Sequence, residues 1–252
     1  MIAPRENPAV NEISVLGQKV RLLQLQNGFR TSMDSVLVAA ACPAKGRENL
    51  LDLGCGVGSA GLCVLYREPQ LRLTGYDISE AAIDLAYQNA ALNKCEGQVQ
   101  FAQQNILTLT SEGTRFDHII CNPPFYESGA HLRSPETDVA VARGFEGSKL
   151  EDWINAAFRI LASRGSLTII FPPAQLPAAL NALGRRFGGT EVFQIQSKAH
   201  EPVKRVIVRS FKDRKGPLVM HRAVIMHDEN GGESDESRKL LREGLSFDTL
   251  VK

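Results

Sequence analysis

The residues with the clearest chemical potential are Asn122-Pro123-Pro124-Phe125, which follow the apolar run Phe116–Cys121. Such a run is typical of a buried strand. Two prolines cannot continue a central strand, because proline donates no backbone hydrogen bond and fixes φ. We therefore expect a rigid, extended turn that presents the Asn122 amide, the Pro123 carbonyl and an aromatic ring. These groups would form a clamp for a planar amine, although a proline-rich turn with an incidental asparagine has the same local sequence.

A glycine-rich stretch, D-x-G-x-G-x-G at Asp52–Gly58, lies between an expected strand at Leu50–Leu53 and an expected helix at Ser59–Tyr66. Glycine permits a positive φ and the close approach of a ligand to the backbone. The dinucleotide fingerprint G-x-G-x-x-G is similar, but here the third glycine comes one residue early. Asp52 also places a negative charge where a pyrophosphate would lie. The stretch therefore favours a ligand that carries an amine or a sulfonium.

Asp77 stands at the carboxyl end of the next expected strand, Leu71–Tyr76, nineteen residues after Gly58. A doubly wound fold places there the acidic residue that accepts hydrogen bonds from ribose hydroxyls. By itself Asp77 could equally be a residue near the start of a helix capped by Ser79. Combined with Asp52–Gly58, its position favours the ribose-binding role.

The elements that must position these residues alternate between strand and helix, which predicts an α/β fold with a doubly wound, mostly parallel, Rossmann-like sheet. Seven strands are expected, the last two as an antiparallel pair: Leu50–Leu53, Leu71–Tyr76, Val99–Ala102, Phe116–Cys121, Ser166–Phe171, Glu191–Ser197 and Arg205–Phe211. The expected helices are Ser35–Cys42, Ser59–Tyr66, Ser79–Leu92, Leu150–Leu161, Ala174–Phe187 and Ser237–Leu245.

The domain organisation that we predict is an N-terminal extension at 1–33 followed by a single domain at 34–252. The extension contains a hairpin within Ile13–Leu25, where apolar and polar residues alternate around a glycine. The segment 126–148 has no sustained apolar period, and an irregular stretch of this length in a compact domain is usually functional or disordered. The segment 228–237 is acidic and rich in turn-forming residues, which predicts a surface loop.

The composition is that of an ordinary globular protein, with 252 residues, 43% hydrophobic and 23% charged. No stretch approaches the ~20 apolar residues of a membrane span, and the first residues lack the blocks of a signal peptide. The five cysteines are odd in number and include no C-x-x-C pair. We expect a reduced, cytoplasmic protein without a metal or a membrane partner.

The net charge of +1 conceals an uneven distribution, because Lys198–Arg222 holds eight basic residues against Glu201 and Asp213. A neutral protein with a basic segment has the charge pattern of a phosphate-backbone binder. The same pattern is found on edge strands, where lysine and arginine discourage aggregation.

Taken together, the motifs LLDLGCGVGSAGL and GYDIS resemble those of class I S-adenosylmethionine-dependent methyltransferases. NPPF resembles the (D/N)-P-P-(Y/F) motif of enzymes that methylate amino groups conjugated to a planar π system. More narrowly, residues 13–247 resemble the bacterial tRNA adenine-N6 methyltransferases that modify the adenine beside the anticodon of a valine tRNA. The matching features are NGFRTSMDSVLVAA before the glycine stretch, FDHIICNPPF, the basic loop after it and the ending SDESRKLLREGLSF.

The resemblance implies S-adenosyl-L-methionine as the cofactor and RNA, most specifically tRNA, as the partner. It implies cofactor contacts from Thr31, Asp34, Asp52, Gly54, Cys55, Gly56, Gly58, Asp77, Ile78, Asn105 and Asn122. It further implies catalytic roles for Asn122, Pro123 and Phe125 and substrate contacts from Pro124, Phe125, Tyr126, Arg133 and Arg143.

The chain departs from the family pattern at three places. Ser32-Met33-Asp34 stands where relatives carry Gly-Thr-Asp, and Phe125 stands where many have tyrosine. Asn105 lies nearest the place of an acidic residue that binds the cofactor adenine amine. An asparagine oxygen can still accept that hydrogen bond, so this change bears on affinity rather than identity.

The mechanism follows from the chemistry of an aromatic amine, whose nitrogen is a poor nucleophile because its lone pair is delocalised. Hydrogen bonds from the amine to the Asn122 side-chain oxygen and the Pro123 carbonyl would favour a pyramidal nitrogen aimed at the methyl group. Orientation of this kind can contribute ~7–11 kcal/mol. Phe125 would stack on a base that has left its neighbours, an interaction of ~1–3 kcal/mol per base, and Tyr126 could stack there too.

Three alternatives remain open from the sequence. The same clamp suits guanine N2 in ribosomal RNA or the amide of a protein glutamine, and a non-enzymatic RNA-binding module could keep the cofactor fold. Intact Asp52, Asp77 and Asn122 argue against the binding module. The glutamine enzymes generally carry a large helical domain, whereas about thirty residues precede the first expected helix here.

Overall fold

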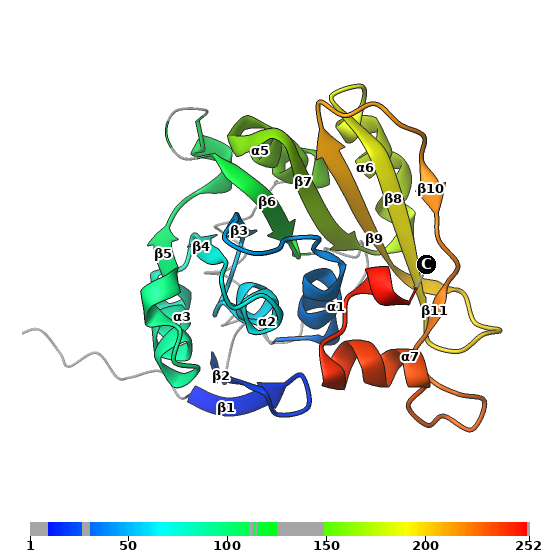
Figure 1. The fold of residues 1–252 in the computed structure, drawn as a ribbon, viewed down its shortest axis with the longest axis horizontal. Helices are drawn as coiled ribbons and strands as arrows, with labels where there is room; N and C mark the ends of the chain where they lie inside the picture. Colours follow the sequence, from blue (N-terminus) through cyan, green and yellow to red (C-terminus); the bar gives the residue numbers. More distant parts are fainter. Residues whose placement is uncertain (1–9, 27–30, 111–112, 114, 125–148, 251–252) are drawn as a thin grey trace, which may run out of the picture.

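The computed structural model describes residues 10–26, 31–110, 113, 115–124 and 149–250. They form a central sheet with helices on both faces and a separate two-stranded hairpin (Figure 1). The strands of the sheet follow the order β10-β8-β9-β7-β6-β3-β4-β5, and β11 also pairs with β8. The seven expected strands form its body, and two strands of two residues each, β10 and β11, bring the total to nine.

The parallel half of the sheet contains β3 (Asn49–Leu53), β4 (Arg72–Asp77), β5 (Val99–Gln103), β6 (Phe116–Cys121) and β7 (Leu161–Phe171). The antiparallel half is formed by β8 (Phe187–Gln196) and β9 (Val203–Lys212), with β10 (Val219–Met220) and β11 (Val224–Ile225) parallel to β8 at the edge. The predicted α/β class and antiparallel closing pair are therefore confirmed.

The core is divided by the sheet into two clusters, because successive residues of a strand face opposite sides. On β3, for example, Leu50 belongs to one cluster and Leu51 to the other. The first cluster also contains residues of α1 (Met33–Ala41), α2 (Ser59–Arg67) and α3 (Glu80–Leu92). The second contains residues of α5 (Leu150–Ile160) and α6 (Leu176–Leu183).

The N-terminal hairpin consists of β1 (Val10–Val15) and β2 (Val20–Leu25), paired antiparallel as expected. In Figure 1 it lies beside α2 and α3, away from α5 and α6. Leu22 is fully buried and belongs to the first core cluster. The hairpin is therefore packed against the main fold.

Three element boundaries differ from expectation. The helix expected at Ala174–Phe187 is a 3-10 turn at Pro173–Gln175 followed by α6, which ends at Gly184 with a positive φ of 53°. Phe187 is 5% exposed and opens β8. Likewise, β7 begins directly after α5 rather than at Ser166, with a register shift opposite the start of β6.

Within the surface loop expected at 228–237, the structure has exposed turns at 228–233 and the start of a helix at the end of the range. Ser234 caps the short helix α7 (Asp235–Arg238), which continues as a π-helical turn at Lys239–Glu243. A 3-10 turn at Phe247–Thr249 follows and packs into the core through Phe247. Asp235 and Glu236 lie in the first turn of this helix, where negative charge is stabilised by the helix N-terminus.

Candidate active site

The glycine stretch connects β3 to α2 and is tied to the neighbouring strand. The amides of Gly54 and Cys55 both donate to the carbonyl of Tyr76, at 2.8 and 2.9 Å. Gly54 has a φ of 74°, and a Cβ there would come within 2.5 Å of the Trp153 ring. Only glycine therefore fits at this position, for conformational and for steric reasons.

Asp52 lies beneath the loop formed by the glycine stretch, with 2% of its surface exposed. Its Oδ2 accepts a hydrogen bond of 2.8 Å from the amide of Gly61 in α2. Burial raises the pKa of Asp52 to about 7, although the bond from Gly61 opposes the rise and the charge of Asp77 adds to it. Asp52 thus holds the start of α2 through the amide of Gly61.

Asp77 ends β4 and is directed toward the backbone of the loop. Its Oδ2 accepts from the amide of Gly56 at 2.8 Å, and its Oδ1 accepts from the amide of Ser79 at 2.9 Å. Burial raises the pKa of this carboxyl, and the hydrogen bonds oppose that rise. Each carboxylate oxygen keeps a further lone pair, so Asp77 can still accept hydrogen bonds from a ligand.

Two further predicted cofactor residues lie near the ends of β4 and β5. The carbonyl of Ile78 accepts from the Nε2 of Gln103 at 2.9 Å, which joins the two strand ends. Asn105 caps the 3-10 turn Ile106–Thr108, and its Oδ1 accepts from the amide of Leu107 at 2.9 Å. Its amide group makes no other contact within the described residues and is available to a ligand.

Thr31 and Asp34, the predicted cofactor residues before and within α1, have contacts with different parts of the fold. The hydroxyl of Thr31 lies 2.6 Å from that of Ser59, the first residue of α2, which brings Thr31 to the glycine stretch. Asp34 instead forms an ion pair of 2.8 Å with Arg205 on β9. The structure shows no contact between Asp34 and the glycine stretch, so its expected cofactor contact stays a prediction.

The Asn122-Pro123-Pro124 turn leaves β6 beside the glycine stretch, because β6 pairs with β3 in parallel. Within the described part of the chain, neither the Asn122 side chain nor the Pro123 carbonyl has a hydrogen-bond partner. Phe125, Tyr126, Arg133 and Arg143, and with them the loop expected at 126–148, lie outside the described residues. Of the predicted clamp, the structure therefore describes the two polar groups, on Asn122 and Pro123, and Phe125 stays a prediction.

A pocket of about 320 Å³ lies next to this turn. Its lining is mainly apolar, with one ammonium and one amide: Pro123, Pro124, Lys149, Leu150, Trp153, Gln175 and Ala178. The Trp153 side chain both lines the pocket and contacts Gly54. Sequence reasoning did not single out Trp153, Lys149 or Gln175, although the lone tryptophan in the helix after the 126–148 segment was a usable signal.

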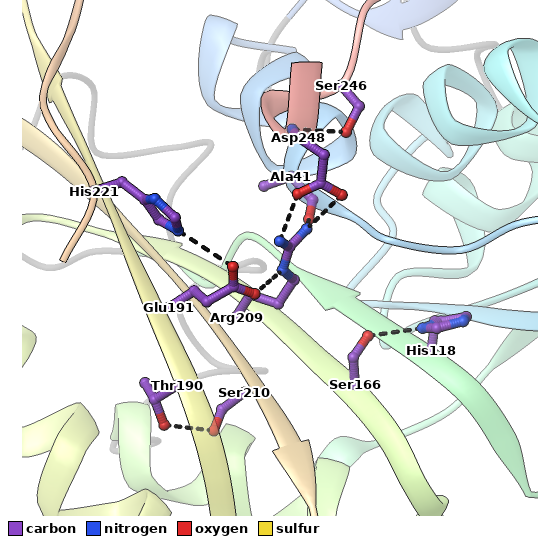
Figure 2. Close-up of polar contacts among 10 residues, drawn as sticks. All are labelled: Ala41, His118, Ser166, Thr190, Glu191, Arg209, Ser210, His221, Ser246 and Asp248. Atoms are coloured by element: carbon purple, nitrogen blue, oxygen red, sulfur yellow. Dashed lines mark hydrogen bonds and ion pairs between the residues drawn. The ribbon is translucent and has the colours of Figure 1, made fainter. Parts of the chain in front are cut away.

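Some of the cations in the basic segment Lys198–Arg222 are paired within the fold, and others are exposed. Arg209 is 4% exposed and bonds to Glu191 and Asp248, each at 2.7 Å, and to the carbonyl of Ala41 at 3.0 Å (Figure 2). Lys212 donates to two backbone carbonyls at the end of α5. These cations are satisfied inside the fold. The exposed cations of the segment are Lys204, Arg214, Lys215 and Arg222, of which Lys204 pairs with Glu201 and Arg222 with Glu236.

In the residues that the structure describes, no group of three or more His, Cys, Asp or Glu side chains is arranged to hold a metal. No helix among them is both long and apolar enough to cross a membrane.

The mostly parallel sheet with helices on both faces, the glycine stretch after β3 and the acidic residue at the end of β4 are together typical of a class I methyltransferase. In agreement, the family model described as "Methyltransferase small domain" matches residues 31–199. The chain belongs to this methyltransferase family.

Two similar proteins share a more specific name, tRNA1(Val) (adenine(37)-N6)-methyltransferase. The protein of Porphyromonas gingivalis is 31% identical over 71% of this chain and 73% of its own length. That of Vibrio campbellii is 26% identical over 86% of this chain and 89% of its own length. A crystal structure of a predicted O-methyltransferase from Agrobacterium tumefaciens superposes with a TM-score of 0.68 at 25% identity, over 85% of this chain and 97% of that one.

Proposed function

We propose that this methyltransferase transfers the methyl group of S-adenosylmethionine to the exocyclic N6 amino group of an adenine in RNA, with tRNA as the substrate and the cytoplasm as the location. The observation that carries the proposal is that, within the described residues, the Asn122 side chain and the Pro123 carbonyl beside the glycine stretch have no hydrogen-bond partner. The names of the relatives from Porphyromonas gingivalis and Vibrio campbellii support the choice of adenine and tRNA.

The described residues fit the cofactor. A Cβ at Gly56 would meet nothing within 4 Å, so the backbone there is open to a ligand, and Asp77 has spare lone pairs for two ribose hydroxyls. Asn105 would contact the adenine of the cofactor. When bound, S-adenosylmethionine would supply a methyl group that is activated by the positive charge on sulfur. The buried carboxyl of Asp52, when ionised, would favour the binding of this positive charge.

Asn122 and Pro123 provide the acceptor half of the reaction. The Asn122 oxygen and the Pro123 carbonyl would each accept one N–H of the adenine amine. This holds the nitrogen pyramidal and its lone pair directed at the methyl carbon. The nitrogen–carbon bond forms as the carbon–sulfur bond breaks, and the extra proton on nitrogen leaves to water. The fixed turn contributes orientation, and no strong base is required.

The remaining predicted residues would hold the RNA. Phe125 and Tyr126 would stack on bases, and Arg133 and Arg143 would contact phosphates. The pocket beside the turn adds an ammonium from Lys149 and an amide from Gln175 on an apolar floor. A planar nucleotide matches this combination, because apolar surface covers the base and the two polar groups reach its edge or phosphate.

The test is nucleoside analysis of total tRNA from a strain that lacks the gene, with and without the purified protein added back. We expect one N6-methyladenosine to disappear in the deletion strain and to return with the wild-type protein, but not with Asn122→Ala. Restoration of N2-methylguanosine instead, or activity on protein alone, would contradict the proposal.

A further inference from the structure

The outer edge of β2 is bonded by two asparagine side chains of α3, one helical turn apart. Asn93 accepts from the amide of Arg21 at 3.0 Å and donates to its carbonyl at 2.7 Å. Asn89 accepts from the amide of Leu23 at 2.6 Å and donates to its carbonyl at 3.0 Å. The spacing of the two asparagines matches that of their partners on β2, because four residues of a helix rise ~6 Å and two residues of a strand advance ~6.7 Å.

Asn89 differs from Asn93 in one respect that concerns the cofactor site. Its Nδ2 also donates to the carbonyl of Val57, at 2.9 Å, in the middle of the glycine stretch. The corresponding extra bond of Asn93, at 2.7 Å, goes to the backbone carbonyl of Asn89 within α3. Asn89 is fully buried and uses both amide hydrogens and its oxygen. It therefore joins three elements, whereas Asn93 joins two.

The glycine stretch is thus held from two sides. Asp77 fixes the amide of Gly56, and Asn89 fixes the carbonyl of Val57 one residue later. Because a peptide unit is planar, fixing this carbonyl also fixes the direction of the next amide, which belongs to Gly58. The residues between β3 and α2 consequently have little freedom to rotate away from the cofactor.

A second connection starts from the same strand. The Oε1 of Gln24 in β2 accepts from the amide of Thr31 at 3.0 Å, and Gln24 is 7% exposed. The Thr31 hydroxyl in turn bonds to Ser59 at the start of α2. The hairpin, which precedes the residues matched by the family model, is therefore connected through Asn89 to Val57 near the end of the glycine stretch and through Thr31 to Ser59, the first residue of α2.

We infer that Asn89 is a positioning residue that orders the glycine stretch for cofactor binding. Through Asn89, the β1–β2 hairpin contributes to the cofactor site. The inference rests on the proposed use of S-adenosylmethionine. Docking of the hairpin directs Asn89 to Val57, and the loop so ordered presents its backbone to the ligand. Without Asn89 the Val57 carbonyl is buried and unpaired, which favours loop conformations that do not bind.

The test compares Asn89→Ala with Asn93→Ala, since each removes a matched pair of bonds to β2 but only the first frees Val57. We expect both variants to unfold at a lower temperature than the wild type. In calorimetry with S-adenosylhomocysteine, Asn89→Ala should bind about tenfold more weakly, and Asn93→Ala should stay within about twofold of the wild type. In steady-state assays, Asn89→Ala should raise KM for the cofactor and leave kcat unchanged.

A ligand-free measurement separates this inference from the proposed function. Hydrogen exchange of a peptide that covers residues 54–60 should be faster in Asn89→Ala than in Asn93→Ala. If Asn89→Ala fails to fold, Asn89→Asp keeps an oxygen that can accept from Leu23 but lacks the Nδ2 that donates to Val57, and it provides the same comparison. Equal exchange and equal affinity in the two variants would overturn the inference. A wild-type protein that binds no S-adenosylhomocysteine would instead overturn the proposed function.

Discussion

The two halves of the candidate site differ in how their polar groups are satisfied before any ligand binds. In the cofactor half, Asp52, Asp77 and Asn89 already bond to the backbone around the glycine stretch. In the acceptor half, the Asn122 side chain and the Pro123 carbonyl have no partner within the described residues. The first half is preorganised by the protein, whereas the two acceptors of the second half are open to a substrate within the described part of the chain.

This difference indicates how the two ligands are handled. A preorganised site loses little entropy on binding, which suits a small ligand used in every turnover. Unpaired acceptors beside it reject molecules that lack matching donors, since a buried acceptor left without a donor costs ~1–3 kcal/mol. We therefore expect substitutions in the two halves to have separable effects, and the following predictions test that separation.

The largest expected effect follows Asn122→Ala, which removes one of the two acceptors for the substrate amine. Methyl transfer in a single-turnover assay with saturating cofactor should fall by about 10²-fold or more, as it does when a single group positioned for the transition state is removed. Asn49→Ala, at the start of β3 and therefore at the opposite end of that strand from the glycine stretch, serves as the control. Comparable slowing by both variants would contradict the clamp.

Asp77→Ala should show the opposite pattern. Loss of charge-assisted hydrogen bonds of ~1.5–3 kcal/mol should weaken cofactor binding roughly 10- to 100-fold, with little change in KM for tRNA. Asp84→Ala removes an exposed carboxylate of α3 and controls for the change in net charge. If Asp77→Ala raises KM for tRNA as much as KM for the cofactor, the two halves of the site do not have separable effects.

A third prediction concerns the pH dependence contributed by Asp52. Its pKa in the fold is about 7, against ~3.9 in an unfolded chain, so the stability of the ligand-free protein should fall as pH rises across this window. A cationic ligand favours the ionised carboxyl, and its affinity should therefore rise as pH passes through about 7. Titrations of S-adenosylmethionine at several pH values should show this rise in the wild type and a flatter profile in Asp52→Asn. If the wild type and Asp52→Asn have the same pH profile, Asp52 is not the cause of the pH dependence of affinity.

The smallest effect is expected from the pocket beside the turn. Lys149→Ala should raise KM for tRNA by a few fold without changing cofactor affinity, because one exposed cation contributes modestly to phosphate binding. Lys45→Ala, at the opposite ends of the strands, is the control. Binding measured at two salt concentrations should show a shallower salt dependence for Lys149→Ala alone.

The sequence predicted the parallel strands, the glycine stretch, Asp77 and the Asn-Pro-Pro turn because each has a local signal. Asn89 carried no such signal. An asparagine in an amphipathic helix has many roles, and its partner Leu23 lies 66 residues away along the chain. Arg209 was missed for a similar reason: a count of cations cannot show that Glu191 and Asp248 neutralise this one inside the fold. Side-chain partners that are distant in sequence became visible only with the fold.

The most direct test of the difference between the two halves is a calorimetric titration of S-adenosylhomocysteine into the wild type, Asn122→Ala and Asp77→Ala. The account predicts that Asn122→Ala, although inactive, binds with a Kd within a factor of about three of the wild type, while Asp77→Ala binds at least about tenfold more weakly. A loss of affinity in Asn122→Ala that equals the loss in Asp77→Ala would contradict it, because Asn122 would then belong to the cofactor half.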